Sequence, residues 1–333
     1  MPTRSQRTAC RRVVQWYMRL HYGAACDPGS AEMFTSRAHL GHFAVDRARV
    51  RAGDPQALFQ LLIAVAMFQR RQDTQIMKIL RGISRRDMSE LTDPWRLLRL
   101  ADDAGCPHLA SSTALHGECD LTKVDGAGTC GQAPRIGCAP KRHTVMLKRY
   151  GDFGKLPTSA ALMLREADAR DLAHAFRSIL NEVQGATARA VAMEALVCRV
   201  WHVHEKLAAM YLSLLTNPDP HLGFGTFSEG IDWRYFVAID SNVTNFLQWI
   251  SYGGAPTYSA RRAFVRELSR RIELSEVNPR LRGTNPRVIQ QALYLFASST
   301  NRRALDADCS RLGASACRSC PRPLVSLCPL AQE

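Results

Sequence analysis

Four cysteines near residue 328 constrain the fold of this chain more than any other feature. They follow the pattern Cys309-x7-Cys317-x2-Cys320-x7-Cys328, one close pair with a single cysteine on each side. Unrelated thiols are one interpretation. Structural zinc sites of four cysteines usually use two Cys-x2-Cys pairs, and only one such pair is present here. An iron–sulfur cluster accepts single cysteines from a wrapped loop, so the pattern favours a 4Fe–4S cluster.

The charge of the chain favours a polyanionic partner. Lys and Arg together number 44 against 30 Asp and Glu, a net charge of +14. Nucleic acid or an anionic membrane surface would suit this excess, and a solvated basic surface is the alternative. The longest apolar run, 58–68, is too short to cross a bilayer. The chain opens without a recognisable export signal and has eleven cysteines, so we expect reduced thiols and a cytoplasmic, nucleoid-associated protein.

Apolar residues recur at helical spacing along most of the chain, so an all-α fold is expected. The first amphipathic helix has Val13, Val14, Tyr17 and Leu20 on one face, and 58–68 predicts a buried helix. In 260–272 apolar residues form one face and five arginines (Arg261, Arg262, Arg266, Arg270 and Arg271) surround it. The positions Val288, Ile289, Ala292, Leu293, Leu295 and Phe296 predict a further helix. The stretch 232–239 is the one candidate strand.

Residues 103–142 interrupt the helical pattern. They are rich in Gly, Cys and Pro, and a long irregular segment inside a helical domain needs something besides a core to order it. The segment carries Cys106, His108, His116, Cys119, Cys130 and Cys138. These residues supply more ligands than one tetrahedral zinc requires, although no pair has the Cys-x2-Cys spacing. A structural zinc is therefore predicted, and a loop that merely carries cysteines is the alternative.

The region 285–330 resembles the carboxyl end of the endonuclease III and adenine-glycosylase family. That family closes with a helix and a C-x6-C-x2-C-x5-C loop around a 4Fe–4S cluster. The spacing here is one residue longer in the first gap and two longer in the last. Three upstream segments resemble the family in the same order: 58–73, 203–215 and 237–247. The resemblance implies a two-lobed helix–hairpin–helix fold that binds double-stranded DNA as a monomer.

The resemblance also implies roles for single residues. Lys206 takes the place of the nucleophilic lysine and Asp240 that of the catalytic aspartate. Gln69 or Arg70 would fill the gap left by an extruded base, and basic residues beside the cluster, here Arg302 and Arg303, would meet phosphates. His202 and His204 replace small residues of the hairpin. Because non-glycine residues resist positive φ, we expect these two histidines to contact DNA through their side chains, or else to belong to a metal site.

These residues predict two lobes and a reaction. A helical barrel of residues 58–234 would carry the 103–142 insertion, and residues 1–57 with 235–333 would form the second lobe, including the cluster loop at 305–330. DNA would lie between the lobes with one base rotated out of the stack. The expected function is excision of a damaged or non-standard base, with strand cleavage at the abasic site if Lys206 acts. A non-catalytic relative that binds DNA or a protein is the alternative, and an RNA-directed protein is a third idea.

Overall fold

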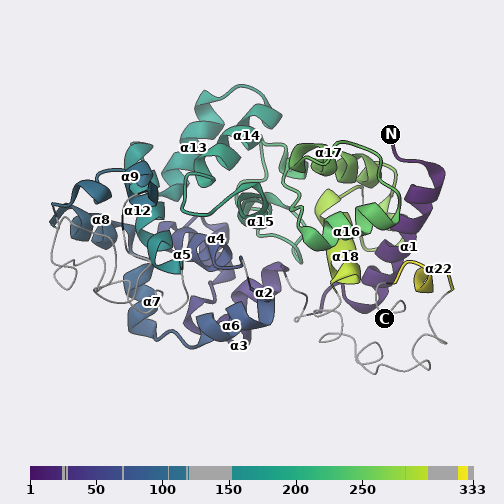
Figure 1. Cartoon of the computed structure of the whole chain (residues 1–333), viewed down its shortest axis with the longest axis horizontal. Helices are drawn as coiled ribbons and strands as arrows, with labels where there is room; N and C mark the ends of the chain where they lie inside the picture. The colour runs from purple at the N-terminus through teal and green to yellow at the C-terminus, as the bar shows by residue number, and fades with distance from the viewer. Residues whose placement is uncertain are drawn as a thin grey trace. The chain divides into compact units, whose positions relative to one another are not determined.

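The computed structural model of the chain describes residues 1–24, 27, 29–69, 71–103, 105–117, 119, 152–281, 283–298 and 322–328. Every regular element in these ranges is a helix, which confirms the all-α expectation (Figure 1). The candidate strand at 232–239 is instead a turn of 3-10 helix, η4 (Trp233–Tyr235), followed by an irregular buried segment. No helix among the described residues is long and apolar enough to span a membrane.

The chain divides into two compact units. Unit 1 contains residues 1–33, 217–223 and 233–333, and unit 2 contains 34–216 and 224–232. The expected lobes began and ended at 58 and 234. The units change at 33/34 and 232/233, and the chain returns briefly to unit 1 at 217–223.

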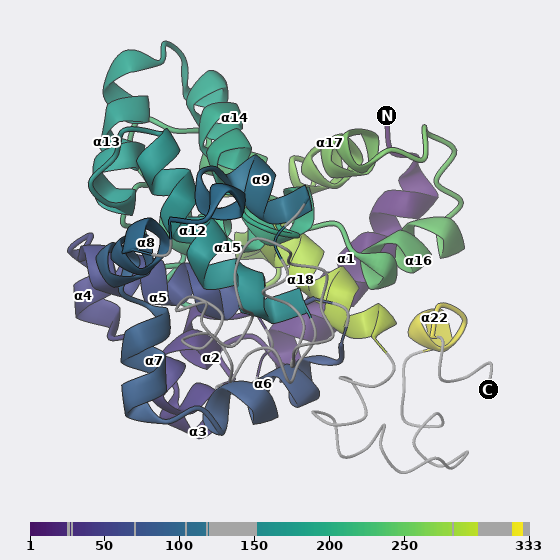
Figure 2. The same ribbon diagram turned by 60° about the vertical axis from the view of Figure 1, so that its left-hand side comes forward.

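Unit 1 is built around α18 (Pro286–Ala297), which contacts the three other long helices of the unit. These are α1 (Arg4–Leu20), α16 (Ser241–Trp249) and α17 (Tyr258–Ser269); η5 (Leu274–Glu276) and α22 (Arg322–Val325) are shorter. Figure 2 shows α1, α16 and α18 from a second side. All six apolar positions expected on α18 are buried. On α1, Val13 and Val14 are fully buried, but Leu20 is 56% exposed because the helix ends there.

Side-chain hydrogen bonds join residues 217–223 to unit 1. Asn217 and Asn285 exchange two amide hydrogen bonds of 3.2 and 3.1 Å. His221 Nε2 lies 2.9 Å from the Asp27 carboxylate, which is 1% exposed as a residue. Buried polar groups are costly unless they are paired. This pairing therefore explains why the short segment stays with a unit whose other parts are distant in sequence.

Unit 2 is a larger set of helices around α5 (Pro55–Ala66). The others are α3 (Arg37–Leu40), η1 (Gly41–Phe43), α4 (Arg47–Arg51), α6 (Asp73–Arg81), α7 (Arg85–Leu91), α8 (Pro94–Asp103), η2 (Pro107–Leu109), α9 (Ser112–Gly117), η3 (Asp152–Lys155), α12 (Leu156–Glu166), α13 (Leu172–Glu182), α14 (Ala186–Val197) and α15 (Glu205–Thr216); α2 (Ala31–Thr35) spans the change of unit. Asp54 caps α5 by accepting from the Ala57 amide at 2.8 Å. Gln60 is tolerated inside the buried helix because its amide donates to the carbonyls of His42 and Ala44.

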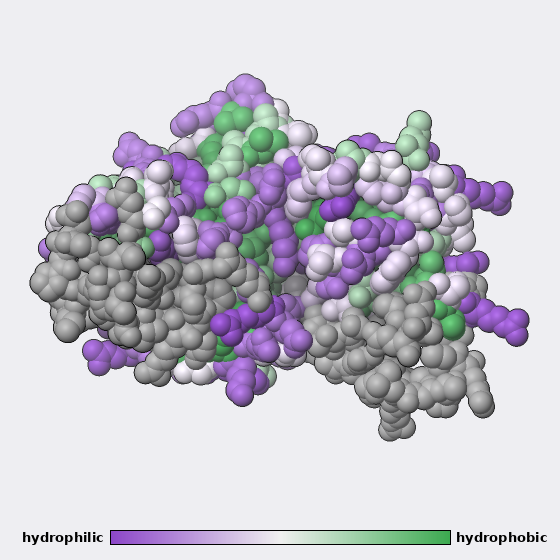
Figure 3. All heavy atoms as spheres, in the orientation of Figure 1, coloured by the Kyte–Doolittle hydropathy of each residue, from purple (hydrophilic) through white to green (hydrophobic). Residues whose placement is uncertain are grey.

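Part of the segment expected to be irregular is helical. α9 lies within 103–142, and its Leu115 joins Leu109, Ala101 and Leu162 in a small buried cluster. Apolar residues from α8 and α12 thus order this part of the insertion. Hydrophilic side chains cover much of the described face in Figure 3, with hydrophobic ones visible over α13 and α14.

Candidate functional site in the hairpin and at Asp240

The connection between α14 and α15 contains a left-handed residue. His202 has a φ of 54°, and the Val203 amide donates to the Val200 carbonyl at 2.9 Å. A turn with this hydrogen bond and a positive φ at its third residue usually has glycine there. Val200 and Val203 are each 1% exposed, so buried side chains fix both ends of the turn. The expectation that histidine would resist this conformation was wrong.

His202 differs from the two other described non-glycine residues with positive φ. Asp168 and Ser251 have φ values of 50° and 58°. Each follows the last turn of a helix, and the amide after it donates back into that helix, to Leu164 and Leu247 respectively. Left-handed residues at helix ends are common. His202 follows the end of α14 by several residues, so its conformation is part of the connection 198–204 between α14 and α15, called the hairpin below.

A buried serine holds this turn. The Trp201 amide donates to Ser159 Oγ at 2.8 Å, and His116 Nε2 lies 2.8 Å from the same oxygen. Because Ser159 Oγ accepts from Trp201, its own proton is available to His116, whose Nε2 then accepts. Burial, followed by the charges of Lys155 and His202, lowers the pKa of His116, which favours this neutral ring. Ser159 is fully buried, so the pair anchors the turn and does not present a nucleophile.

The indole of Trp201 lies among three basic side chains. The ring centroids of His202 and His116 lie 4.0 and 5.1 Å from that of Trp201. Lys155 Nζ lies 4.2 Å from a Trp201 ring centroid and donates to the His116 carbonyl at 3.1 Å. Lys155 is 5% exposed as a residue. Cation–π contacts strengthen when the cation is desolvated, so the buried Lys155 holds the indole in place. The indole in turn packs against the ring of His202 and helps to fix its orientation.

Glu166 connects α9, α12 and the segment before the turn. Its carboxylate accepts from the Ser112 amide at 2.5 Å and from Ser112 Oγ at 2.7 Å, and it pairs with Arg199. Burial alone raises the pKa of Glu166, but the hydrogen bonds from Ser112 and Arg199 outweigh it and bring that pKa below its ordinary value. The carboxylate is therefore ionised at neutral pH and holds α9 beside the hairpin.

Lys206 is the second residue of α15 and is half-buried. The helix is fixed to the core of unit 2, since Tyr211 is fully buried and donates to the Leu58 carbonyl at 3.1 Å. The first amides of a helix have no partner within that helix and form the positive end of its dipole. His204 precedes the helix and is exposed. The hairpin therefore presents Lys206, His204 and main-chain donors from one rigid element.

Asp240 caps α16 in unit 1. Its Oδ1 accepts from the Val243 amide at 2.8 Å, and the residue is half-buried. Tyr258 fixes the segment before it, because its hydroxyl donates to the Val237 carbonyl at 2.9 Å and accepts from the Ile239 amide at 3.3 Å. The carboxylate is thus held at a fixed place within its unit. Lys206 and Asp240 belong to different units.

Arginines of α17 pack against tyrosines near the Asp240 segment. The guanidinium carbon of Arg262 lies 3.9 Å from the ring centroid of Tyr235 and 5.4 Å from that of Tyr258. Arg262 also donates to the Tyr235 hydroxyl at 2.5 Å. It is 8% exposed, whereas the sequence placed it among the arginines surrounding an apolar face. Stacking on tyrosine lets a guanidinium be buried where an ammonium would not be.

Gln69 has a local role in this structure. Its amide donates to the Ala66 carbonyl at 2.5 Å, so it satisfies an acceptor at the end of α5. Arg70, the other residue expected to fill the gap of an extruded base, lies outside the described residues.

Only part of the predicted zinc ligand set can be placed. No group of three or more His, Cys, Asp or Glu suited to a metal occurs among the described residues. Cys119 is 8% exposed and packs in the cluster around Leu115, with Cys106 against its edge. His116 instead pairs with Ser159. Cys130 and Cys138 lie outside the described residues, and the zinc site stays a prediction.

Of the four cysteines in the predicted cluster loop, Cys328 lies among the described residues. It is 5% exposed, forms no disulfide, and lies in the core of unit 1 after α22. A buried thiol is compatible with a cluster ligand. Burial raises the pKa of Cys10, in the same core, to about 12, so that residue stays a neutral thiol. Outside the described residues are Cys309, Cys317, Cys320, Arg302 and Arg303.

The residues that support the turn carry no local sequence signal. Ser159, Glu166 and Lys155 lie at least 34 residues before the turn, and nothing in their local sequence points to it. Trp201 directly precedes His202, and a large aromatic residue beside two histidines could have been recognised as a packing platform.

Comparisons of the chain with protein-family models, curated proteins and solved structures found no match. The resemblance to the glycosylase family therefore stays a prediction that rests on the residues of this chain.

Proposed function

We propose that this protein is a DNA glycosylase that excises a damaged or non-standard base. The observation that carries the proposal is the hairpin before α15. His202 supplies there a φ of 54°, a conformation usually left to glycine, and Lys206 follows at the second position of the helix. The net charge of +14 agrees with a nucleic-acid substrate.

The hairpin would bind a phosphate of the DNA backbone. The amides of Trp201 and Val203 are bonded within the protein. The phosphate would therefore meet the first main-chain N–H groups of α15, where the positive end of the helix dipole favours an anion. His204 is exposed beside this position and adds a side-chain donor. The buried Ser159–His116 pair would keep the turn in this conformation before DNA arrives.

Asp240 and Lys206 have separate chemical roles in the proposal. Breaking the N-glycosidic bond develops positive charge on the sugar while the bond electrons leave with the base, and the Asp240 carboxylate would stabilise that charge. The Lys206 amine would attack the sugar C1′ in place of water. The bond between C1′ and the ring oxygen then breaks, which leaves a hydroxyl on C4′ and a Schiff base between Lys206 and C1′. A proton is then lost from C2′ and the 3′ phosphate leaves, which cleaves the strand. Without the lysine step, water attacks C1′ and excision alone remains.

The predicted 4Fe–4S cluster would have a structural role in this protein. Cys309, Cys317, Cys320 and Cys328 would hold it, and it would supply structural order when bound. Iron and sulfide analysis of protein purified without air tests this part. About four irons per chain, the content of a cubane, would support it, and zinc as the sole metal after reconstitution would overturn it.

Borohydride trapping on abasic DNA tests the reaction. Wild-type protein should give a covalent adduct, Lys206→Ala should give none, and Lys78→Ala should behave as wild type because Lys78 is an exposed lysine of α6. Asp240→Asn keeps an N-cap side chain for α16 but removes the charge. This variant should fold normally and excise slowly. DNA affinity without excision over a broad lesion panel would reject the enzyme and leave a DNA-binding protein.

A further inference from the structure

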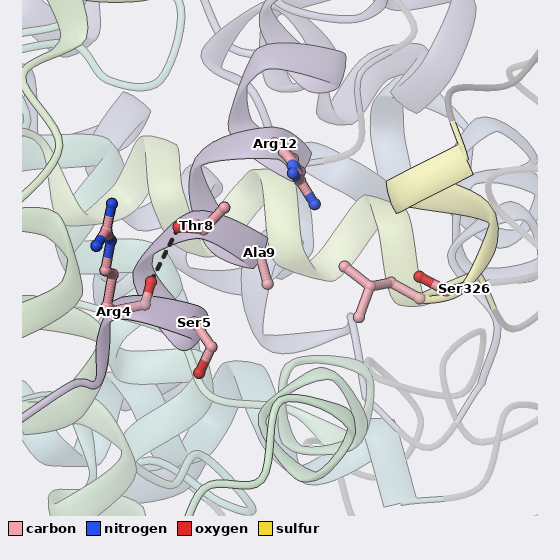
Figure 4. Close-up of a pocket in the computed structure, with 7 residues that line it drawn as sticks. Arg4, Ser5, Thr8, Ala9, Arg12 and Ser326 are labelled. Carbon is pink, nitrogen blue, oxygen red and sulfur yellow. Dashed lines mark hydrogen bonds between the residues drawn. The ribbon is translucent and has the colours of Figure 1, made fainter.

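We propose that Arg4, Ser5 and Arg12 form a second contact with the phosphates of double-stranded DNA, on unit 1. This inference rests on the proposed function, since it concerns how the same substrate is held. The residues line an open hollow of about 410 Å³ between α1 and the turn after α22, together with Thr8, Ala9, Ser326 and Leu327. Figure 4 shows the labelled side chains along α1, with Ser326 across from them.

The charge of α1 is entirely positive. Residues 4–20 include five arginines and no acidic residue. Arg11 is neutralised by Glu276 at 2.5 Å, and Arg7 donates to the Thr3 carbonyl. Within the described part of the chain no ion pair involves Arg4 or Arg12, and both are exposed. Arg7 and Arg19 also lack an ion pair among the described residues, but they do not line the hollow. The two guanidinium groups that do line it, those of Arg4 and Arg12, favour an anionic ligand there.

The hydroxyl groups near the hollow leave one donor available. Thr3 Oγ1 accepts from the Gln6 amide at 3.2 Å and lies 2.9 Å from Ser5 Oγ. With Thr3 donating to Ser5, the Ser5 proton can go to a ligand. Thr8 differs, because its hydroxyl already donates to the Arg4 carbonyl at 2.9 Å (dashed in Figure 4). The donors that α1 offers a ligand in the hollow are therefore Arg4, Ser5 and Arg12, a set suited to phosphate oxygens.

The openness of the hollow argues for a polymer. Ala9 and Leu327 contribute apolar surface, and the donors come from two and a half turns of one helix. A small ligand usually has most of its surface enclosed, which an open hollow does not provide. A duplex backbone presents successive phosphates to separated cations and needs no enclosure.

The test compares duplex DNA affinity across a salt series for four proteins. Arg4→Gln with Arg12→Gln should weaken binding about tenfold and lower the slope of log affinity against log salt by roughly 1.8, because each phosphate contact contributes about 0.9. Arg19→Gln removes the same charge from an exposed position on the same helix outside the hollow. It should change affinity by less than about threefold.

Ser5→Glu tests the same contact in a variant that should fold at least as well as wild type, so that a loss of DNA affinity cannot come from misfolding. A carboxylate in the first turn of a helix favours the helix dipole, so thermal stability should be kept or raised while DNA affinity falls about tenfold by repulsion of phosphate. Unchanged affinity and slope in both hollow variants, with wild-type binding and excision intact, would overturn this inference alone. A wild-type protein without affinity for DNA would overturn the proposed function as well. A loss seen only with RNA or with anionic vesicles would assign the hollow to that partner and reject the DNA contact.

Discussion

Replacing His202 by glycine and by alanine separates the backbone conformation of the hairpin from its imidazole. Both variants lose the ring contact with Trp201, but only alanine keeps the Cβ that opposes a φ of 54°. The left-handed conformation costs a residue with a Cβ about 1–2 kcal/mol. Glycine has more conformational freedom in the unfolded chain, which lowers the stability of the glycine variant by about 0.5–1 kcal/mol. His202→Gly should therefore exceed His202→Ala in free energy of unfolding by about 0.5–1 kcal/mol, or about 1–4 °C in Tm.

Urea denaturation and duplex affinity are the two assays for this pair. If main-chain amides hold the phosphate, His202→Gly should keep its affinity within about twofold of wild type, while His202→Ala binds less tightly because its turn is strained. Asp168 has a φ of 50° at the end of α12. Asp168→Gly and Asp168→Ala should show the same order of stability with no change in DNA affinity.

Two results would refute the reasoning about His202. Alanine as stable as glycine would mean that residue 202 does not keep a positive φ in solution. Equal loss of DNA affinity in the two variants would mean that the imidazole contacts the phosphate, as the sequence analysis expected.

Three further predictions concern the supports of the site. Tyr258→Phe removes the hydroxyl that bonds the Ile239 amide and the Val237 carbonyl, and should lower the free energy of unfolding in urea by roughly 1–2 kcal/mol. The rate of base excision should fall by a larger factor than the affinity for DNA. Glu166→Gln should cost roughly 1–2 kcal/mol at neutral pH. Since the pKa of Glu166 is lowered, that stabilisation is complete above its ordinary pKa of 4.5 and is lost as pH falls through the lower folded value, so the two unfolding curves should converge there. The pKa of His116 is also lowered, from 6.5, so stability should decline as pH falls below 6.5, and His116→Gln should remove this slope.

The sequence was a good guide to helices that bury a continuous face. Apolar spacing identified α5 and α18, because a helix surrounded by core must be apolar on every inward position. It failed at α9, where two leucines and the carboxylate of Glu166 order a segment rich in glycine and cysteine. A contact partner 54 residues away leaves no trace in a local pattern.

Within the candidate site, the sequence pointed only to the residues that are proposed to carry chemistry. Lys206 and Asp240 stood in recognisable stretches, but the supports of the hairpin did not. Ser159 is a small polar residue in an apolar helix, and its function becomes clear only from its contacts with Trp201 and His116. The positive φ of His202 was not predicted, since the intrinsic preference of a non-glycine residue yields to the two buried valines that flank the turn.

The 44 lysines and arginines of the chain overstate the basic surface that a DNA substrate could use. Arg262 is buried between tyrosines, Arg11 is paired with Glu276, and Arg199 is paired with Glu166. A guanidinium that is already stacked or neutralised releases no counterion when DNA binds. The salt dependence of binding should therefore follow the uncompensated groups, Arg4 and Arg12 among them, and should be much smaller than the number of basic residues implies. A slope that also counted the paired arginines would mean that these internal pairs open on the DNA, and the hollow on α1 would then be one basic surface among many.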